Sequence, residues 1–132
     1  MFVIERNWTE NEIKEIDVFL GRAKALLATN DFIIKKTQKN IVFAKRYPMR
    51  HEVQADILKS LTRDDCIDVS PNTDERYADT LVFEFIKDVE ILVYGEQEKV
   101  KLYIKQYIVD NKTHELITVI SFHEEGMYED SY

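Results

Sequence analysis

The last third of the chain alternates apolar with polar residues, which is the period of a half-buried β-strand. The alternation runs through residues 101–105 and again, at hairpin distance, through residues 119–123. Side chains on a strand point to opposite faces in turn, so the polar residues of each segment share one face. If the two strands pair, their common polar face holds Lys101, Tyr103, Lys105, Ser121 and His123. Such groups suit an RNA phosphate and general acid–base chemistry without a metal.

A helical period governs the first half of the chain. Thr9, with Glu12 three residues later, has the form of a capping box, and apolar residues then recur at steps of three and four. This pattern predicts an amphipathic helix over about 10–28. Pro48 stops a later helix, because the residue before a proline avoids helical angles. The elements predicted after the first helix are a strand at 32–34, a helix from Thr37 to about Ala44, a helix at about 50–61 and a capped turn at 61–65.

The second half is predicted to be β structure. Polar residues and one proline at 68–79 indicate a loop, after which apolar residues alternate again. The predicted strands lie at 81–86, 91–94, 100–109 and 115–123, with the last turn at 110–112. Helices followed by hairpin-linked strands are typical of the α+β class, here with N-terminal helices packed on a C-terminal antiparallel β-sheet. The length suits a single domain over 1–132, with a helical layer at about 9–65, the sheet at about 80–123 and an acidic tail at 124–132.

Charge is unevenly distributed along the chain. The net charge of −7 argues against nucleic-acid binding by the whole surface. Residues 32–63, however, carry eight basic and two acidic side chains, whereas residues 64–98 carry two basic and eleven acidic ones. The basic middle and the lysine-bearing hairpin can form one positive face, although they are separated in sequence by the acidic block. The alternative is that these charge runs are solvated surface.

Composition also bears on location. The single cysteine, Cys66, excludes an intramolecular disulfide framework and fits a reducing cytoplasm. Charge occurs by the fifth residue, which is not typical of a signal peptide, and no apolar run approaches the roughly 20 residues that cross a bilayer. We therefore predict a cytoplasmic protein with no membrane partner.

No cofactor and no metal are predicted. The three histidines do not share metal-ligand spacing with a carboxylate, so a zinc site is not expected. The acidic stretch at 64–79 lacks the spacing and the glycine of a calcium-binding loop, and we interpret it as a solvating loop. With three glycines in the chain, a loop that cradles phosphate is not indicated.

Several short motifs follow one another along the chain: Lys39-Asn40, Asp56-Ile57-Leu58, Leu61-Thr62 with Asp65, Pro71 with Asp74, Phe85 with Lys87, Tyr103-Ile104-Lys105 and Ser121-Phe122-His123. Their order and spacing resemble the MqsR family of bacterial toxin–antitoxin toxins, within the RelE-like superfamily. The resemblance covers residues 32–123. It implies a RelE-like fold and a sequence-selective, metal-independent endoribonuclease that cuts mRNA by attack of the ribose 2′-hydroxyl on the adjacent phosphate.

The same resemblance implies roles for individual residues. Tyr103 matches an active-site tyrosine of the family, and His123 falls where members place a lysine or a histidine after Ser-Phe. Lys87 and Lys105 match basic positions suited to phosphate contact. The predicted site therefore has catalytic residues Tyr103, His123 and Lys87 and RNA-binding residues Lys101, Lys105 and Lys39. The implied partners are an RNA substrate and a cognate antitoxin protein that masks the basic face.

Each assignment has an alternative. His123 can be an edge histidine bonded to a neighbouring glutamate, and Tyr103 can pack across strands, as tyrosines in sheets commonly do. The rival function is a non-catalytic domain that binds protein or nucleic acid through the sheet face. Its motivation is the net charge of −7 and the absence, near Cys66, of the lysine that members of the family carry there. A third hypothesis is acidic mimicry of nucleic acid by the block at 64–98 and the acidic tail.

Overall fold

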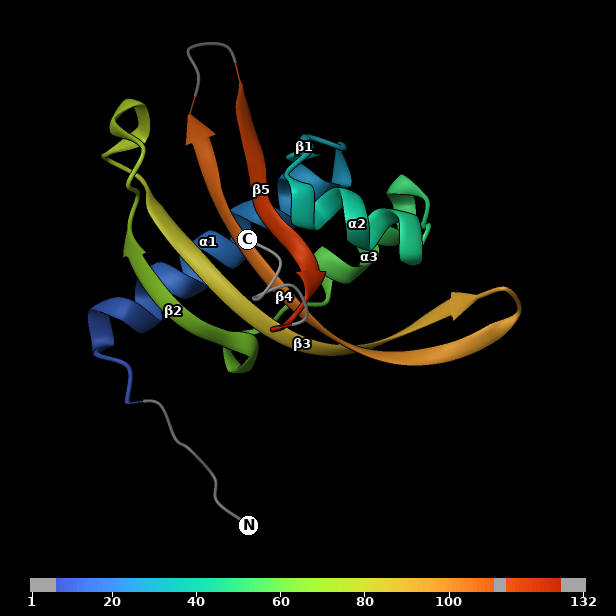
Figure 1. Ribbon diagram of the computed structural model, residues 1–132. Coiled ribbons are helices and arrows are strands. Elements are labelled where there is room, and N and C mark those ends of the chain that lie inside the picture. Colours follow the sequence, from blue (N-terminus) through green and yellow to red (C-terminus); the bar gives the residue numbers. More distant parts are fainter. Residues whose placement is uncertain (1–6, 111–113, 127–132) are drawn as a thin grey trace.

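The structure is a computed structural model that describes residues 7–110 and 114–126 (Figure 1). The elements follow in the order α1 (Glu10–Ala28), β1 (Phe32–Ile34), α2 (Gln38–Arg46), α3 (His51–Lys59), the short helical turn η1 (Arg63–Asp65), β2 (Cys66–Pro71), a second turn η2 (Glu75–Tyr77), β3 (Leu81–Val93), β4 (Glu96–Asp110) and β5 (Glu115–Glu124). Five strands form one sheet in the order β1-β5-β4-β3-β2. β1 runs parallel to β5, and the other neighbours are antiparallel. The predicted α+β class is confirmed; most of the predicted turn at 110–112 and of the predicted acidic tail lies outside the described residues.

Helix α1 begins where the capping box predicts. The Glu12 backbone N–H donates to the Thr9 side chain at 3.1 Å, and the Thr9 N–H donates to the Glu12 carboxylate at 3.0 Å. Phe19, on the buried stripe of α1, stacks on Phe83 of β3 with ring centroids 4.2 Å apart. The helix therefore lies against one face of the sheet, behind β3 in the view of Figure 1.

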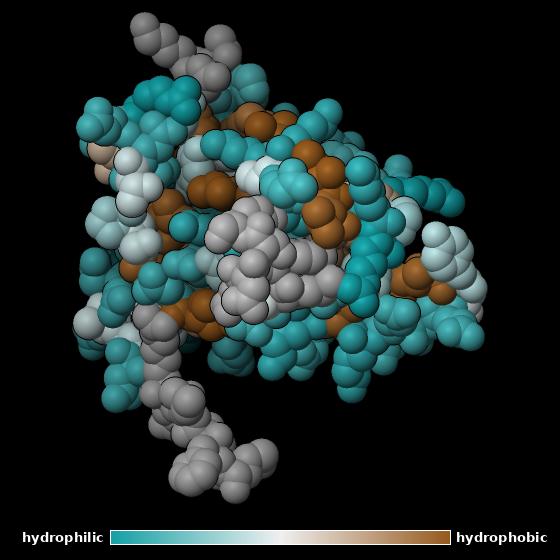
Figure 2. Space-filling model, in the orientation of Figure 1, coloured by the Kyte–Doolittle hydropathy of each residue, from teal (hydrophilic) through white to brown (hydrophobic). Residues whose placement is uncertain are grey.

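The face of the sheet that α1 covers carries the hydrophobic core. The strand residues that are 0% exposed are Phe85, Leu102, Ile104, Ile117 and Val119. Helices α2 and α3 add Phe43, Ala55 and Leu58 to the same cluster. Burial of apolar surface, worth roughly 25 cal/mol per Å², is the main force that holds the helices on the sheet. We call this side the core face and the opposite side the polar face. From the side seen in Figure 2, hydrophilic residues make up most of the visible surface and hydrophobic ones lie in separate patches.

The prediction of a loop at 68–79 is wrong for its first part, which belongs to strand β2. The register of β2 with β3 includes the pair Val69↔Phe83. Only Cys66 of this strand is buried, because β2 is the edge of the sheet and is held by backbone pairing more than by burial. Beyond β2, the turn η2 brings Tyr77 over Tyr107 of β4, with ring centroids 5.7 Å apart. Part of the polar face is covered in this way.

Strand β3 is continuous where two strands were predicted. The charged residues in its middle are paired across to β4, Asp88 with Lys101 and Glu90 with Lys99. Opposite charges that face one another across antiparallel strands stabilise a segment for which apolar alternation alone predicts a break. β3 and β4 thus form a long hairpin that extends beyond the other strands, to the right in Figure 1.

A bulge in β5 sets how this strand faces β4. Lys105 pairs with Ser121, whereas the next residue of β4 pairs with Val119, so Ile120 is the extra residue. The bulge keeps both Val119 and Phe122 in the core cluster. It also leaves Ser121 beside Lys105, on the polar face.

Asn40 of α2 binds the backbone of β5 at this bulge. Its Nδ2 donates to the carbonyl oxygen of Ile120 at 2.9 Å and to that of Lys35 at 2.8 Å. Its Oδ1 accepts from the Phe122 N–H at 2.8 Å. The side chain therefore occupies the place that a backbone would take if β1 were longer. Helix α2 is fixed against β5, and Lys39 with it.

Candidate functional site on the polar face

The polar face brings together the two residues that the alternation and the family resemblance single out most strongly. Tyr103 of β4 and His123 of β5 lie directly opposite one another in the antiparallel register. Their ring centroids are 5.6 Å apart. The predicted pairing of the two strands is confirmed, and it makes an aromatic ring and an imidazole neighbours.

His123 is held in one protonation state by its surroundings. Its Nδ1 lies 2.9 Å from the carbonyl oxygen of Glu124, and a carbonyl can only accept, so Nδ1 carries the proton. The neutral ring then has its lone pair on Nε2. Burial, with the side chain 7% exposed, lowers the pKa of His123, and the positive charge of Lys39 lowers it further against the opposing hydrogen bond to Glu124. The imidazole is therefore neutral at neutral pH, the form that can accept a proton.

Tyr103 is engaged by a carboxylate from the neighbouring strand. Its hydroxyl donates a hydrogen bond to Oε1 of Glu84. Burial raises the pKa of Tyr103 most, and the hydrogen bond to Glu84 and the negative charges of Glu84 and Asp68 raise it further. The phenol stays protonated and acts as a donor. Sequence reasoning missed Glu84, although it alternates with Phe83 and Phe85 and so had to face the polar side once β3 paired with β4.

Three lysines accompany this pair. Lys105 lies directly opposite Glu84 in the register of β3 and β4. Lys101 is exposed and precedes Tyr103 by two residues on the same face. Lys39 comes from α2, close enough for its charge to act on the imidazole. Four of the six predicted site residues thus lie on the polar face, Tyr103, His123, Lys101 and Lys105, and Lys39 of α2 acts electrostatically on His123.

The sixth predicted site residue, Lys87, is on the other side of the sheet. It pairs with Leu102, which lies on the core face, and side chains opposite one another share a face. Its Nζ donates to the carbonyl oxygen of Ser60 at 3.2 Å and to Oδ2 of Asp65 at 3.3 Å. This corrects the expected grouping of Lys87 with Tyr103. The reason is the strand period, which places residue 87 with Phe85 and not with Glu84.

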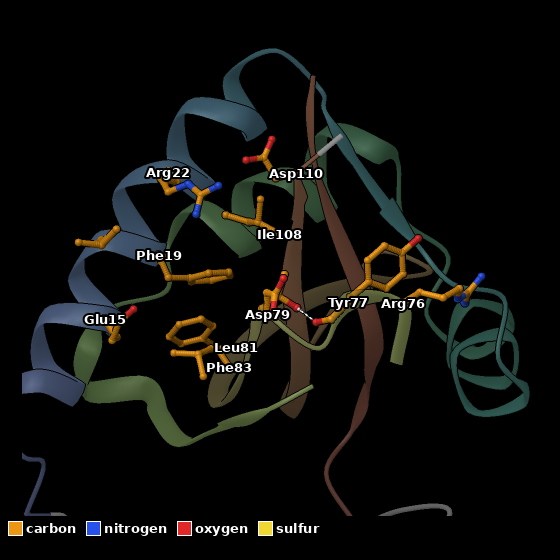
Figure 3. A pocket seen from close by; sticks show the side chains of 12 residues that line it. Glu15, Phe19, Arg22, Arg76, Tyr77, Asp79, Leu81, Phe83, Ile108 and Asp110 are labelled. Carbon is orange, nitrogen blue, oxygen red and sulfur yellow. Dashed lines mark hydrogen bonds between the residues drawn. The ribbon is translucent and has the colours of Figure 1, made fainter. Parts of the chain in front are cut away.

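A separate hollow lies away from these residues. A cavity of about 560 Å³ lies between α1 and the ends of β3 and β4 (Figure 3). Its walls include the stacked rings of Phe19 and Phe83, and its rim carries charges of both signs, among them Arg22 and Asp110. Arg22 is already bound to Glu115 at 2.8 Å. None of the predicted site residues lines this cavity, so the candidate site is the polar face.

The side chains that hold metals do not cluster in the part of the chain that the structure describes. No three His, Cys, Asp or Glu residues there could hold a metal ion. The Cys66 thiol is buried, with Sγ 3.6 Å from the carbonyl oxygen of Asp68. None of the helices at residues 7–110 and 114–126 is long and apolar enough to cross a membrane.

Comparisons with known proteins give this chain no relative. No protein-family model matches it, and neither does a curated protein or a solved structure. The MqsR resemblance and the RelE-like fold stay predictions. The polar face, with Tyr103 and His123 opposite one another, is the observation that bears on function.

Proposed function

We propose that the polar face binds RNA and cleaves it, as a metal-independent endoribonuclease. The observation that carries this proposal is the direct cross-strand pair of Tyr103 and His123, with ring centroids 5.6 Å apart and Lys105 on the same face. RNA cleavage through the 2′-hydroxyl uses a base near that hydroxyl and cations near the phosphate. Single-stranded RNA is also commonly held by aromatic rings on a sheet.

In the proposed reaction, Nε2 of neutral His123 takes the proton of the ribose 2′-hydroxyl. The 2′-oxygen forms a bond to the adjacent phosphorus while the bond from phosphorus to the 5′-oxygen breaks. The 5′-oxygen leaves with a proton from the Lys105 ammonium, which gives a 2′,3′-cyclic phosphate and a 5′-hydroxyl. The lowered pKa of His123 supports the base role, because the ring is neutral at physiological pH. Solvent then returns the proton from His123 to Lys105.

The other residues of the polar face position the RNA. The raised pKa of Tyr103 and its bond to Glu84 keep the phenol protonated, so its contribution is a stacking ring of fixed orientation. Lys39 from α2 and Lys101 from β4 come from different elements and suit phosphates on the two sides of the cut.

The first test is cleavage of a fluorescent RNA in buffer containing a chelator. Wild-type protein is expected to cut it, to leave a 2′,3′-cyclic phosphate, and to leave intact an RNA with deoxyribose at the cut position. His123→Ala should lower the rate by about 10²–10⁴-fold, the usual contribution of a general base. Tyr103→Phe, which frees Glu84, should lower it as well.

The matched control is His114→Ala, which removes an exposed imidazole from the residue just before β5. Circular dichroism should show that all variants are folded. Wild-type rates in both His123→Ala and Tyr103→Phe would refute this assignment of the site. Cleavage of the deoxyribose substrate would refute the chemistry.

The proposal includes a toxin–antitoxin pairing. A ribonuclease that acts on mRNA harms the cell that makes it, so we expect a cognate antitoxin that covers the polar face. Inducible expression in a bacterial host should arrest growth and produce defined mRNA fragments. Both effects should be lost with His123→Ala. Normal growth with intact mRNA, from folded wild-type protein, would contradict the toxin role.

A second candidate function is a non-catalytic binding domain. It is favoured by the 7% exposure of His123 and by the capture of the Tyr103 hydroxyl by Glu84, which both describe side chains already satisfied within the sheet. This candidate predicts that RNA binds to the wild type without being cut. It also predicts that His123→Ala leaves the affinity unchanged.

A further inference from the structure

A groove runs along β1, at one end of the sheet as the structure describes it. The groove has a volume of about 550 Å³. It is lined by Phe32, Ile33, Ile34, Lys35, Lys36, Asn40, Ile41, Ala44, Lys45, His51 and Gln54, and we call it the β1 groove. It is distinct from the pair of Tyr103 and His123, neither of which lines it.

The β1 groove follows the edge of the strand. Phe32 is 3% exposed and stacks on His51 of α3, with ring centroids 4.1 Å apart, so its side chain points to the helices. Its neighbour Ile33 is 47% exposed. Successive side chains of a strand point to opposite faces, so one depression that contacts both residues must run along the edge between the faces.

Within residues 7–110 and 114–126, the ladder hydrogen bonds of β1 run to β5, on one side of the strand. The Ile117 N–H donates to the Asp31 carbonyl oxygen at 3.0 Å, and the Lys35 N–H donates to the Val119 carbonyl oxygen at 2.9 Å. In a parallel ladder, alternate residues of a strand bond the same neighbour. The backbone groups of Phe32 and Ile34 therefore point away from β5, toward the groove, as those of an edge strand do.

The charge of the β1 groove is entirely positive. Of the described residues that line it, three are lysines and none carries a carboxylate. The whole chain, by contrast, has a net charge of −7. The positive charge of Lys35 also lowers the pKa of Asp74, whereas Lys36 and Lys45 are exposed cations of the groove. The lining also includes two exposed apolar side chains, Ile33 at 47% and Ile41 at 36% exposed.

We propose that the β1 groove binds an extended, acidic segment of a partner protein, which adds to the sheet as a strand beside β1. Backbone groups of Phe32 and Ile34 would pair with the segment, alternate apolar side chains would cover Ile33 and Ile41, and carboxylates would meet Lys36 and Lys45. Binding of such a segment goes beyond the proposed RNA cleavage and does not depend on it. Neither Tyr103 nor His123 lines the β1 groove.

The test titrates the isotope-labelled full chain with a heptapeptide of alternating glutamate and valine, followed by amide chemical shifts. The expected shifts lie in β1 and α2. Hydrogen exchange at the amides of Phe32 and Ile34 should slow in the complex. The double variant Lys36→Glu/Lys45→Glu should bind this peptide at least about tenfold more weakly. It should bind a lysine–valine heptapeptide more tightly than the wild type does.

The matched control is Lys14→Glu/Lys24→Glu, the same change of charge on exposed positions of α1. Equal losses in both double variants, shifts centred away from β1, or unchanged exchange at Phe32 and Ile34 would overturn the proposal. The proposal would also be overturned if the wild type bound oligouridylate but not the peptide, and if Lys36→Glu/Lys45→Glu abolished the binding of oligouridylate. A dimer in sedimentation that the groove variant dissociates, without peptide binding, would assign the groove to a second copy instead.

Discussion

The two faces of β3, β4 and β5 are built from alternate residues of the same strands, yet they have opposite contents. On the core face, Phe85, Leu102 and Ile104 are each 0% exposed and contact other apolar side chains. On the polar face, Tyr103 and His123 are neighbours, and each has a hydrogen-bonding partner within the sheet. The core face holds the fold together by burial, whereas the polar face holds a set of titratable groups in fixed positions.

The comparison implies that stability and chemistry can be changed separately. Loss of an apolar group from the core face removes burial and leaves a cavity. Loss of a group from the polar face removes one of a few directed hydrogen bonds, each worth about 1 kcal/mol net. Substitutions on the core face should therefore act mainly on the free energy of unfolding, and substitutions on the polar face mainly on the proposed RNA cleavage.

The largest effect is expected for Phe85→Ala, at the centre of the core face. Removal of a fully buried ring should lower the free energy of unfolding by about 3–5 kcal/mol. Urea denaturation followed by circular dichroism measures it. Leu92→Ala is the control, since this leucine of the same strand is 64% exposed and should cost less than about 0.5 kcal/mol. Equal costs at the two positions would contradict the distinction between buried and exposed parts of β3.

Asn40→Ala should have the next largest effect, because this side chain joins α2 to β5. It is 4% exposed, and its removal leaves the Phe122 N–H and the Ile120 carbonyl without their partner. A buried polar group left unpaired costs about 1–3 kcal/mol, so we expect a loss of about 2 kcal/mol in the free energy of unfolding. Asn11→Ala, at an exposed position of α1, should cost nothing measurable in the same denaturation experiment. If Asn40→Ala lowered the free energy of unfolding no more than Asn11→Ala does, water would have taken over the hydrogen bonds of the Asn40 side chain.

The sequence predicts those features of the fold that depend on residues close together along the chain. The capping box of Thr9 and Glu12 is present as expected, and alternation at 101–105 and 119–123 predicts that Tyr103 and His123 share a face. These features depend on residues close in sequence or on the period of a strand. Neither needs knowledge of what packs elsewhere.

Other features depend on partners distant in sequence, and the pattern does not predict them. β2 is an edge strand held by pairing, and its second half at 68–71, Asp-Val-Ser-Pro, has the composition of a loop. The continuity of β3 depends on charges of β4, such as Lys101 opposite Asp88. The hydrogen bond from Tyr103 to Glu84 depends on the register of β3 and β4, and a sequence motif containing Lys87 does not say which face of the sheet that lysine occupies.

The pH dependence of stability should report His123, with a smaller effect. Its pKa is lowered in the folded protein, so as the pH falls through about 6.5 the unfolded chain takes up the proton first. The free energy of unfolding should therefore decrease from about pH 7 to about pH 5.5, by less than about 1.4 kcal/mol per pH unit, the limit for one proton. Urea denaturation at several pH values measures this slope.

His123→Gln should remove that contribution, and His114→Gln is the matched control at an exposed position. The carboxyls of Asp17 and Asp74, whose pKa values are lowered by Arg63 and Arg76, act at more acidic pH and do not interfere. An unchanged slope in His123→Gln would mean that the histidine is not buried in the neutral form.

The smallest effect, and the sharpest test of the two faces, is expected for Lys87→Met. The lysine binds Asp65 at 3.3 Å on the core face, but Asp65 also accepts from the Thr62 N–H at 2.8 Å, so it keeps a partner when the lysine is gone. The free energy of unfolding should change by less than about 1 kcal/mol.

RNA cleavage should not change in Lys87→Met, whereas Lys105→Met, the same substitution on the polar face, should slow it by at least about tenfold. The family resemblance alone predicts that both variants lose activity. Cleavage lost in Lys87→Met and kept in Lys105→Met would show that the reaction does not take place on the polar face, because Lys87 of β3 and Tyr103 of β4 lie on opposite sides of the sheet.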